Sequence, residues 1–384
     1  MAHGKIAIIG GGISGLSTAA ALQQKGICAE VFEKGKDFSG PDTGIILSGN
    51  AIRSFYLMGL GRQIIANGVT ADQCLVKSHS GDIIANFDYH SPSHIPNYLF
   101  IQRSVLLKIL TEALLPGTLH FDKELIDFNQ ISQTIKLDFK DGSTADAEYL
   151  IGSDGTDSPI RKKVIPESKL SLSGSVCWRG FLDNPSSSSL SRIPYTETWG
   201  PRGRFGIAPM PGNRLYWYAI KKSRSSKTDF SNWTPIDLLF NFFYYHDPIQ
   251  LILESTLPEN IIFDELSVLQ PLEHFSFGNI LLVGDSAHAS MPNIGQGASQ
   301  AIEEAAYLSK WISTEDTIEK AFEKYELNRL ERMRLVKNEM KIYGLAAKVD
   351  FPLLCSIRNK LLQLAPAGYH NEKLKKLVEI EEEI

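Results

Sequence analysis

The chain has 384 residues, of which 43% are hydrophobic and 22% charged, and its formal net charge is −5 at pH 7. This length allows a large core and two joined domains, and the composition is typical of a globular protein. An acidic chain without a basic stripe argues against nucleic acid as a partner, because neutralising phosphates needs a net basic face.

The first elements alternate strand, helix and strand, at residues 5–9, 14–25 and 29–33. This order predicts a parallel sheet. Between the first strand and the helix, Gly10, Gly12 and Gly15 fit the GxGxxG pattern, with Ser14 inside it. The first glycine makes a tight turn, the second admits a pyrophosphate, and the third lets the helix pack closely on the strand. Glu33 ends the second strand where a ribose hydroxyl is normally held, so the pattern predicts a dinucleotide without saying which one.

The next elements predict a return to the same sheet. A helix is expected over 50–58, short strands over 74–78 and 82–87, and a strand over 99–102 that leads through Arg103 into a helix over 104–114. Strands follow at 135–139 and 149–152. The second of these ends at Asp154 and Gly155, which is again a carboxylate and a glycine at the end of a strand.

From residue 174 to 220 the pattern becomes purely β, which predicts a second, sheet-rich domain. Strands are expected over 176–181, 204–208 and 215–220, and they carry Arg204 and Tyr216. Side chains alternate between the faces of a strand, so Tyr216 and Tyr218 should share one face and Trp217 should lie on the other. The serine-rich segments 183–189 and 221–227 are typical of exposed connectors.

A strand and a helix near residue 285 form the most informative segment. Residues 280–283 are a run typical of a buried strand, and Gly284 and Asp285 end it with a carboxylate. Pro292 then breaks the chain, and Gly295 and Gly297 open a helix that runs to about residue 308. Long helices are expected over 315–347 and 352–364.

The four cysteines, at positions 28, 74, 177 and 355, lie far apart and form no CxxC pair. Their spacing predicts neither a zinc site nor a redox dithiol, and we expect no metal. The chain shows no signal-peptide features, and no apolar stretch reaches the roughly 20 residues that span a bilayer. We expect a cytoplasmic protein with reduced thiols and no transmembrane segment, as a monomer or homodimer.

The three motifs, in this order and after strands, resemble those of the single-component aromatic-hydroxylase family of flavoprotein monooxygenases, which includes para-hydroxybenzoate, salicylate and urate hydroxylases. The resemblance covers residues 5–308. It implies an α/β fold, with an FAD-binding Rossmann-like βαβ domain, an inserted antiparallel substrate sheet and C-terminal helices. We assign residues 1–72, 98–172 and 270–340 to the FAD-binding domain, 73–97 and 173–269 to the substrate-binding domain, and 341–384 to a C-terminal helical segment.

The resemblance also implies roles for individual residues. Glu33 would bind the adenosine ribose of FAD, Asp285 the ribityl chain, and Arg103 would lie beside the flavin. Asp154 would link FAD and nicotinamide binding, or only fix its own turn. The helix that begins near Gly295 would stabilise negative charge on the reduced flavin. The remaining expected cofactor contacts are Gly10, Gly12, Ser14, Gly15, Gly297 and Ala298.

Three residues are candidates for catalysis: Arg204, Tyr216 and Pro292. Arg204 and Tyr216 resemble the arginine and tyrosine with which urate hydroxylases hold and activate substrate. Cys177, however, stands where those enzymes would carry an asparagine, and core packing of the sheet explains each aromatic residue equally well. His288 is expected to be structural rather than an acid or base.

The resemblance implies that NAD(P)H reduces FAD and that O₂ then gives a C4a-hydroperoxyflavin, which hydroxylates an electron-rich aromatic or heteroaromatic small molecule. NAD(P)H, O₂ and this substrate are the expected partners, and NAD(P)H should dock transiently because the chain has one GxGxxG only. Two alternatives use the same flavin chemistry, namely inactivation of a tetracycline-type polyketide antibiotic and alkene epoxidation. A non-catalytic flavin-binding protein is the remote alternative.

Overall fold

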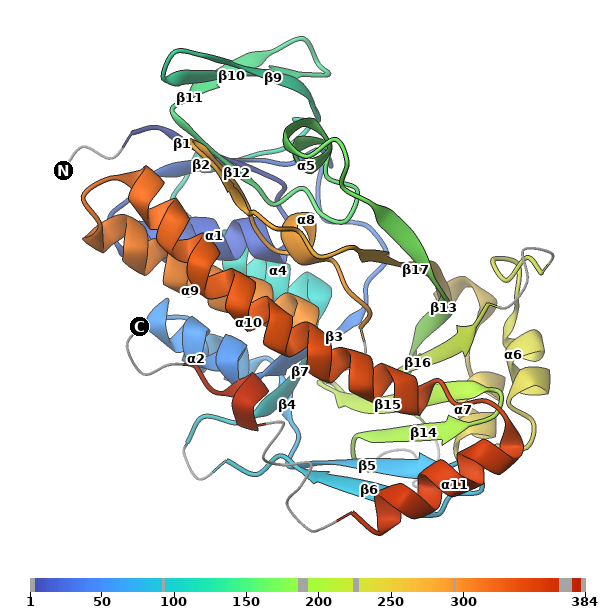
Figure 1. The fold of residues 1–384 in the computed structure, drawn as a ribbon. Coiled ribbons are helices and arrows are strands. Elements are labelled where there is room, and N and C mark those ends of the chain that lie inside the picture. Colours follow the sequence, from blue (N-terminus) through green and yellow to red (C-terminus); the bar gives the residue numbers. More distant parts are fainter. Residues whose placement is uncertain are drawn as a thin grey trace.

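The computed structural model describes residues 4–91, 94–185, 193–223, 228–292, 295–365 and 375–380. A six-stranded sheet with helices packed against it forms one half of the molecule, and a seven-stranded sheet forms the other (Figure 1). Two three-stranded sheets complete the β-structure described. The α/β class expected from the sequence is confirmed.

The six-stranded sheet carries the first strand of the chain in its interior. Its order is β18-β19-β12-β1-β2-β8, and β19, β12, β1 and β2 run parallel. β1 (Ile6–Ile9) is buried along its whole length, as in a parallel strand covered on both faces. Since parallel strands end at the same edge, the turns after β1, β12 and β19 lie side by side. The other bounds are β2 Ala29–Phe32, β8 Leu119–His120, β12 Tyr149–Gly152, β18 Ser276–Phe277 and β19 Ile280–Leu282.

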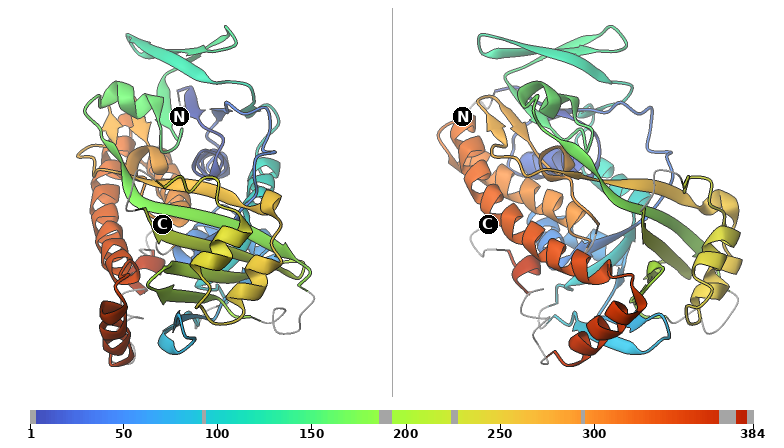
Figure 2. Two further views of the ribbon diagram at one scale, coloured as in Figure 1. Left: turned by 90° about the vertical axis from the view of Figure 1, so that its right-hand side faces the viewer. Right: turned by 45° about the vertical axis from the view of Figure 1, so that its right-hand side comes forward.

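The seven-stranded sheet has the order β17-β13-β16-β15-β14-β5-β6, so it joins strands from two distant parts of the chain. On one face Trp178, Phe205 and Trp217 pack against α6 and α7, which cover that face in Figure 2. Tyr216 and Tyr218 lie on the opposite face, as the alternation predicted. The bounds are β5 Gln73–Ser78, β6 Ile83–Asp88, β13 Leu170–Asp183, β14 Thr196–Gly200, β15 Gly203–Met210, β16 Arg214–Lys222 and β17 Ile262–Leu269.

The two small sheets have different positions. The sheet β3-β7-β4 lies between the six-stranded sheet and the seven-stranded sheet, and the sheet β11-β10-β9 projects from the far end of the molecule (Figure 1). Their strands are short and antiparallel. Their bounds are β3 Gly44–Ser48, β4 Val69–Thr70, β7 Tyr98–Gln102, β9 Leu125–Ile131, β10 Thr134–Phe139 and β11 Thr144–Ala147.

The helices pack mainly on the six-stranded sheet and on one another. α9 (Gln296–Thr314) lies between α1 (Ile13–Gln24), α2 (Gly49–Leu57) and the long α10 (Ile318–Ala347), which runs along it in Figure 1. α11 (Pro352–Gln363) packs on β6 of the other sheet, so the C-terminal helices connect both halves. The others are α3 Gly61–Ala66, α4 Arg103–Glu112, α5 Pro159–Val164, α6 Pro235–Asn241, α7 Ile249–Glu254, η1 Pro258–Asn260 and α8 Asp285–His288.

Most elements expected from periodicity are present within a few residues of their expected bounds. The helices α6 and α7 were not expected, because they are short and their apolar residues show too few turns to establish a period. Among the described helices, none combines the length and the apolar character needed to cross a membrane. The domain boundaries stay a prediction, although β5 and β6 do join the strands of 173–269 in one sheet.

The glycine at position 15 generates a first prediction. A Cβ there would lie 1.9 Å from the carbonyl oxygen of Gly10. The helix α1 could relieve this clash only by moving away from β1. We expect Gly15→Ala to lower the free energy of unfolding by about 3 kcal/mol, measured by urea unfolding. Gly12→Ala is the control, because a Cβ at Gly12 has no atom within 4 Å. Both variants are compared as ligand-free protein, so that weaker ligand binding does not enter the measured stability. Equal stability of the two variants would contradict this account of the close approach.

Candidate active site

The glycine-rich turn lies between β1 and α1, as expected. Gly15 sits directly against Gly10, whereas the space around Gly12 is open, which leaves room for a ligand at the N-terminus of α1. That N-terminus offers backbone N–H groups and a partial positive charge. The Ser14 hydroxyl is buried and has no hydrogen-bond partner among the described residues. The turn therefore has both the space and the donors for a pyrophosphate.

Glu33 lies across this turn at the end of β2. Its carboxylate accepts hydrogen bonds from the backbone N–H of Gly11 at 2.6 Å and of Gly35 at 2.8 Å. The side chain is half-buried and borders the open space beside Gly12. Glu33, the residue predicted to bind the ribose, is thus in a position where its carboxylate can hold both the turn and a ribose hydroxyl group.

Asp154 follows β12, the neighbour of β1, and lies against the same turn. One carboxylate oxygen accepts a hydrogen bond from the Ile160 N–H at 3.1 Å, and the other is buried without a partner among the described residues. Burial raises the pKa of this carboxyl above its usual range, against the hydrogen bonds with Ser158 and Ile160. A buried oxygen without a partner is costly in a finished protein, so a ligand group at this point fits the structure.

The turn after β19 is held by a buried carboxylate from α9. Glu304 accepts hydrogen bonds from the Gly284 N–H at 2.8 Å and forms a 2.6 Å contact with Nε2 of His288. His288 is 2% exposed, so the predicted structural role agrees with its position. Asp285 instead points into an open cleft, although protein surrounds it on most sides and raises the pKa of its carboxyl by desolvation.

The N-terminus of α9 borders the same cleft. Gly295 has a positive φ of 67°, a left-handed conformation that favours glycine, and it starts the helix beside Ile46 of β3. Gly297 has open space around it. Together with Pro292 and Ala298, these glycines form one wall of a cavity of about 300 Å³. The helix N-terminus expected to face a flavin is therefore exposed to a cavity that also contains Asp285.

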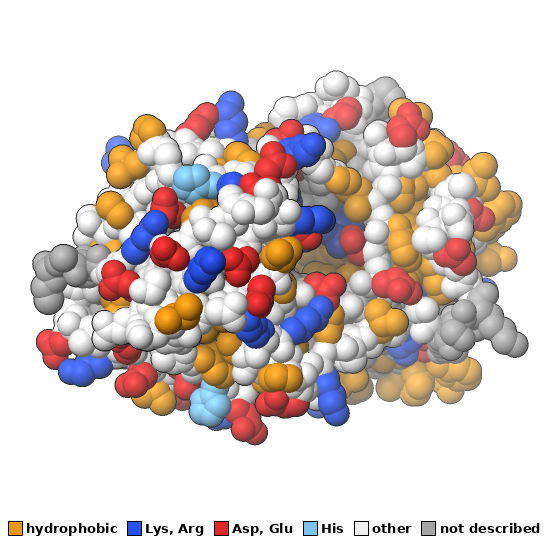
Figure 3. Space-filling view, turned by 90° about the horizontal axis from the view of Figure 1, so that it is seen from above, with side chains coloured by type: hydrophobic (Ala, Val, Ile, Leu, Met, Phe, Trp, Pro, Cys, Tyr) orange, Lys and Arg blue, Asp and Glu red, His pale blue; other side chains and the backbone are white. Residues whose placement is uncertain are grey.

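The opposite wall comes from the inner face of the seven-stranded sheet. Tyr216 and Tyr218 of β16, Cys177 and Arg179 of β13, and Tyr195 line it. A cavity lined by aromatic rings with a few polar groups is typical of a small-molecule site. Seen from the side of β9–β11, the molecular surface is hollowed, and acidic and basic side chains are interspersed around the hollow (Figure 3).

Arg179 lines the cavity but was not among the catalytic candidates predicted from the sequence. Its guanidinium forms an ion pair with Asp264 of β17 at 2.6 Å. Burial raises the pKa of the Tyr216 hydroxyl, and Arg179 acts in the opposite direction by stabilising the phenolate. Its spacing of two residues from Cys177 on a β-strand was the available signal, because it places both on one face.

Arg204 lies on the same face of the sheet but in a different environment from Tyr216. It is 3% exposed and lies 3.5 Å from the carboxylate of Glu197. Glu197 also accepts hydrogen bonds from Tyr218 at 2.7 Å, Tyr343 at 2.5 Å and the Trp199 indole at 2.6 Å. Arg204 does not line the cavity that contains Tyr216 and Pro292; it lines a neighbouring one.

Arg103 begins α4 and is half-buried there. Its backbone N–H donates to the carbonyl of Thr43 at 2.8 Å, and Thr43 lines the cavity while Arg103 itself does not. No group of three or more His, Cys, Asp or Glu residues in the described ranges could hold a metal ion, so these residues offer no metal site.

The family model described as "FAD binding domain" matches residues 4–219 and 268–338, which is well over half of the chain. The chain belongs to this family. FAD is its cofactor, and the resemblance to single-component aromatic hydroxylases is confirmed.

Two similar proteins and one similar structure illustrate the relationship. The aurachin C monooxygenase/isomerase of Stigmatella aurantiaca is 27% identical over 94% of each chain. The 6-hydroxynicotinate 3-monooxygenase of Bordetella bronchiseptica is 28% identical over 87% of this chain and 89% of its own. The crystal structure of Klebsiella pneumoniae HpxO with FAD and uric acid has a TM-score of 0.87 at 22% identity, covering 97% of this chain and 96% of that one.

The role of Asp285 gives a second prediction. Its carboxylate is open to the cleft, and a charge-assisted hydrogen bond to a ligand hydroxyl is of the stronger kind. We expect Asp285→Ala to weaken FAD binding by about tenfold or more, measured as flavin absorbance per protein after gel filtration. Asp316→Ala removes an exposed carboxylate that pairs with Lys320 and should retain FAD. A normal flavin content in Asp285→Ala would overturn the assignment.

The buried Glu304 gives a third prediction, on pH. Burial raises its pKa, but His288, Arg329 and the Gly284 N–H outweigh this and lower it from 4.5 to about 2. A depressed carboxyl pKa stabilises the fold above pH 4.5, and the stabilisation is lost as the pH falls from 4.5 to 2. We expect the wild type to lose roughly 3 kcal/mol more than Glu304→Gln across this window in urea unfolding.

The exposed Glu323 on α10 provides the matched control for this measurement. Glu323→Gln should show the same pH dependence as the wild type, since its carboxylate is exposed to water. If Glu304→Gln also followed the wild-type curve, the buried carboxylate would not be the group that titrates.

Proposed function

We propose that this protein is an FAD-dependent monooxygenase that uses NAD(P)H and O₂ to hydroxylate an aromatic or heteroaromatic small molecule. The observation that carries the proposal is the shared cavity. One wall presents Asp285 and the N-terminus of α9, and the other presents Tyr216, Arg179 and further aromatic residues. A flavin and a ring substrate can therefore meet in one cavity.

The residues expected to hold FAD divide into three groups along the cleft. Gly12, Ser14 and Glu33 would bind the adenosine and pyrophosphate portion, and Asp285 the ribityl chain. The N-terminus of α9, at Gly295 and Gly297, would stabilise negative charge on the reduced ring. When bound, FAD supplies the redox chemistry and the activation of O₂.

Tyr216 and Arg179 are the groups we propose to act on the substrate. Desolvation raises the pKa of Tyr216 more than Arg179 lowers it, so Tyr216 would be a neutral hydroxyl that can donate a hydrogen bond to a substrate oxygen or nitrogen. The Arg179 guanidinium would stabilise negative charge on a deprotonated substrate ring. A deprotonated ring is richer in electrons and is attacked more readily by an electrophilic oxygen. The aromatic lining excludes water, which protects the reaction from unproductive side steps.

The positively charged residue that we propose to act on the substrate is thus Arg179, whereas the sequence predicted Arg204. The Arg204 guanidinium faces a buried carboxylate, whereas Arg179, which pairs with Asp264, lines the cavity. Arg204 acts through Glu197, which anchors the hydroxyl of Tyr218. We therefore propose Arg204 as a positioning residue for the cavity wall.

The volume of the cavity favours a small ring over a polycyclic polyketide. At about 300 Å³ it stands at the lower end of the range typical of ligand sites, roughly 300–1,000 Å³. NAD(P)H is proposed to dock transiently, since the chain has a single GxGxxG.

The fourth prediction tests this function with a panel of phenols, hydroxylated pyridines, purines, a tetracycline and an alkene. We expect a small ring compound to stimulate NAD(P)H oxidation by the holoenzyme and to gain one oxygen atom by mass spectrometry. Formation of hydrogen peroxide without an oxygenated product would indicate that the compound stimulates the reaction but is not the substrate. A flavin that NAD(P)H does not reduce with any compound would favour a non-catalytic role.

Once a substrate is found, Tyr216→Phe and Arg179→Met probe the sheet wall. Each substitution removes a group that would assist the loss of a proton from the substrate, so we expect kcat/KM to fall by about a hundredfold. Both should retain FAD, because neither lies on the Asp285 wall. Tyr244→Phe is the control, since Tyr244 is 79% exposed and its loss should change nothing. Wild-type kcat/KM in both test variants would contradict the proposed roles.

A further inference from the structure

The sheet wall of the cavity that contains Asp285 carries an ion pair between Arg179 and Asp264. Arg179 lies on β13 opposite Ile262 of β17, and Asp264 lies two residues further along β17, on the same face of the sheet. The guanidinium and the carboxylate approach to 2.6 Å. Strand pairing therefore places a carboxylate directly beside a cation of the cavity.

Asp264 holds the guanidinium from the side away from the cavity. Its side chain is 42% exposed and does not line the cavity, whereas the Arg179 side chain is 25% exposed and does. Burial raises the pKa of the Tyr216 hydroxyl and of the Cys177 thiol, and a hydrogen bond from Arg179 opposes the rise in both. One guanidinium thus spans the wall, with Tyr216 and Cys177 on the cavity side and a carboxylate on the outer side.

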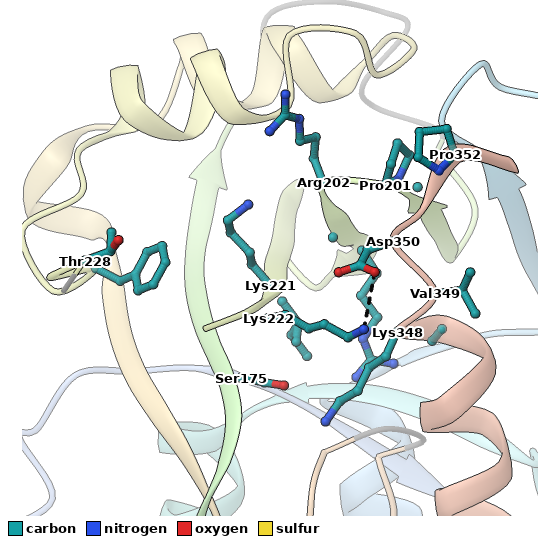
Figure 4. A pocket seen from close by; sticks show the side chains of 16 residues that line it. Ser175, Pro201, Arg202, Lys221, Lys222, Thr228, Lys348, Val349, Asp350 and Pro352 are labelled. Carbon is teal, nitrogen blue, oxygen red and sulfur yellow. Dashed lines mark ion pairs between the residues drawn. The ribbon is translucent and has the colours of Figure 1, made fainter. Parts of the chain in front are cut away.

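A second cavity, of about 570 Å³, lies next to the first, and its lining includes several cationic side chains. Lys222 there pairs with Asp350 at 3.4 Å, and Figure 4 shows Arg202 and Lys348 pointing to opposite ends of that cavity. None of these four residues lines the cavity that contains Arg179. Among the described residues that do line it, Arg179 is the only one with a cationic side chain.

A ring that carries a carboxylate would bring a second anion to a guanidinium that already has one. In the proposed reaction, Arg179 stabilises the negative charge that forms when the ring loses a proton. A permanent carboxylate on the same ring adds a charge for which the described lining offers no further cation. Taking such a charge out of water is costly unless a cation pairs with it. A ring without a carboxylate avoids this cost.

We propose that Asp264 is a specificity-determining residue, which occupies the guanidinium of Arg179 and so restricts the cavity to uncharged rings. This inference rests on the proposed function, because it takes the cavity to be the site of the ring substrate. The substrate class is then an uncharged hydroxylated or nitrogen-containing ring, which loses its proton only inside the cavity. Rings with a carboxylate are excluded by charge rather than by size.

The test titrates oxidised, FAD-loaded enzyme at pH 7 with matched pairs of rings that differ by one carboxylate. The pairs are phenol and 4-hydroxybenzoate, 2-hydroxypyridine and 6-hydroxynicotinate, and 4-hydroxyquinoline and 4-hydroxyquinoline-2-carboxylate. In each pair that binds, we expect calorimetry to show an affinity at least about tenfold higher for the uncharged member. In Asp264→Asn the guanidinium is released, so the affinity for the carboxylate member should rise about tenfold while that for the uncharged member stays the same.

Glu265→Gln is the matched control for this variant. Glu265 follows Asp264 on β17 and is exposed, and the alternation of side chains places it on the other face of the sheet. Its substitution removes the same charge from the same strand without releasing Arg179. The ratio of the two affinities should therefore equal that of the wild type.

Equal or tighter binding of the carboxylate members by the wild type would overturn the inference, and so would a wild-type ratio in Asp264→Asn. The wild-type comparison needs no variant, so it remains decisive if Asp264→Asn fails to fold. None of the titrations needs NAD(P)H, O₂ or turnover, so either of these results leaves the proposed function to be judged by the oxygenation assay. If none of the compounds binds, both the inference and the proposed ring site are wrong.

Discussion

The position of the whole site depends on one buried carboxylate, Glu304. It joins the turn at Gly284 to α9 and, through Arg329 at 3.4 Å, to α10. Both groups are almost fully buried, and each charge has more than one partner: Glu304 also contacts His288, and Arg329 also pairs with Glu303 at 2.5 Å. The contact with Gly284 fixes the turn before Asp285 against α9, together with the hydrogen bond from the Ser286 hydroxyl to the Gly152 carbonyl at 2.6 Å. A structural ion pair thus sets the geometry on which the cofactor site relies.

The second constraint is the division of the substrate sheet into two faces. The outer face buries tryptophan and phenylalanine side chains against α6 and α7, which makes the sheet rigid. The inner face can then carry polar groups such as Tyr216 and Arg179 at the cavity. Arg179 pairs with Asp264 on β17, and the neighbouring Tyr218 hydroxyl donates to Glu197 on β14, so polar groups on this face have partners on other strands.

Much of the half of the molecule that contains the six-stranded sheet could be predicted from the sequence alone. The strands that precede Gly10, Asp154 and Gly284 are neighbours in one parallel sheet, so their turns had to meet at the same edge. The alternation of Tyr216, Trp217 and Tyr218 likewise predicted their faces. What could not be predicted was the pairing of Arg204 with Glu197, because they lie on neighbouring strands in a register that the sequence does not show.

The sequence by itself determined the cofactor-binding frame, because each motif combines a strand, a turn and a helix that are contiguous in the chain. Only the tertiary structure decided that Arg179 of β13 lies at the cavity that contains Asp285, whereas Arg204 lies outside it. Arg179 and Asp285 are far apart along the chain and are brought together by strand pairing and helix packing. The periodicity of one segment carries no information about contacts between distant segments. The residues on the substrate side of the cavity could therefore be identified only from the tertiary structure.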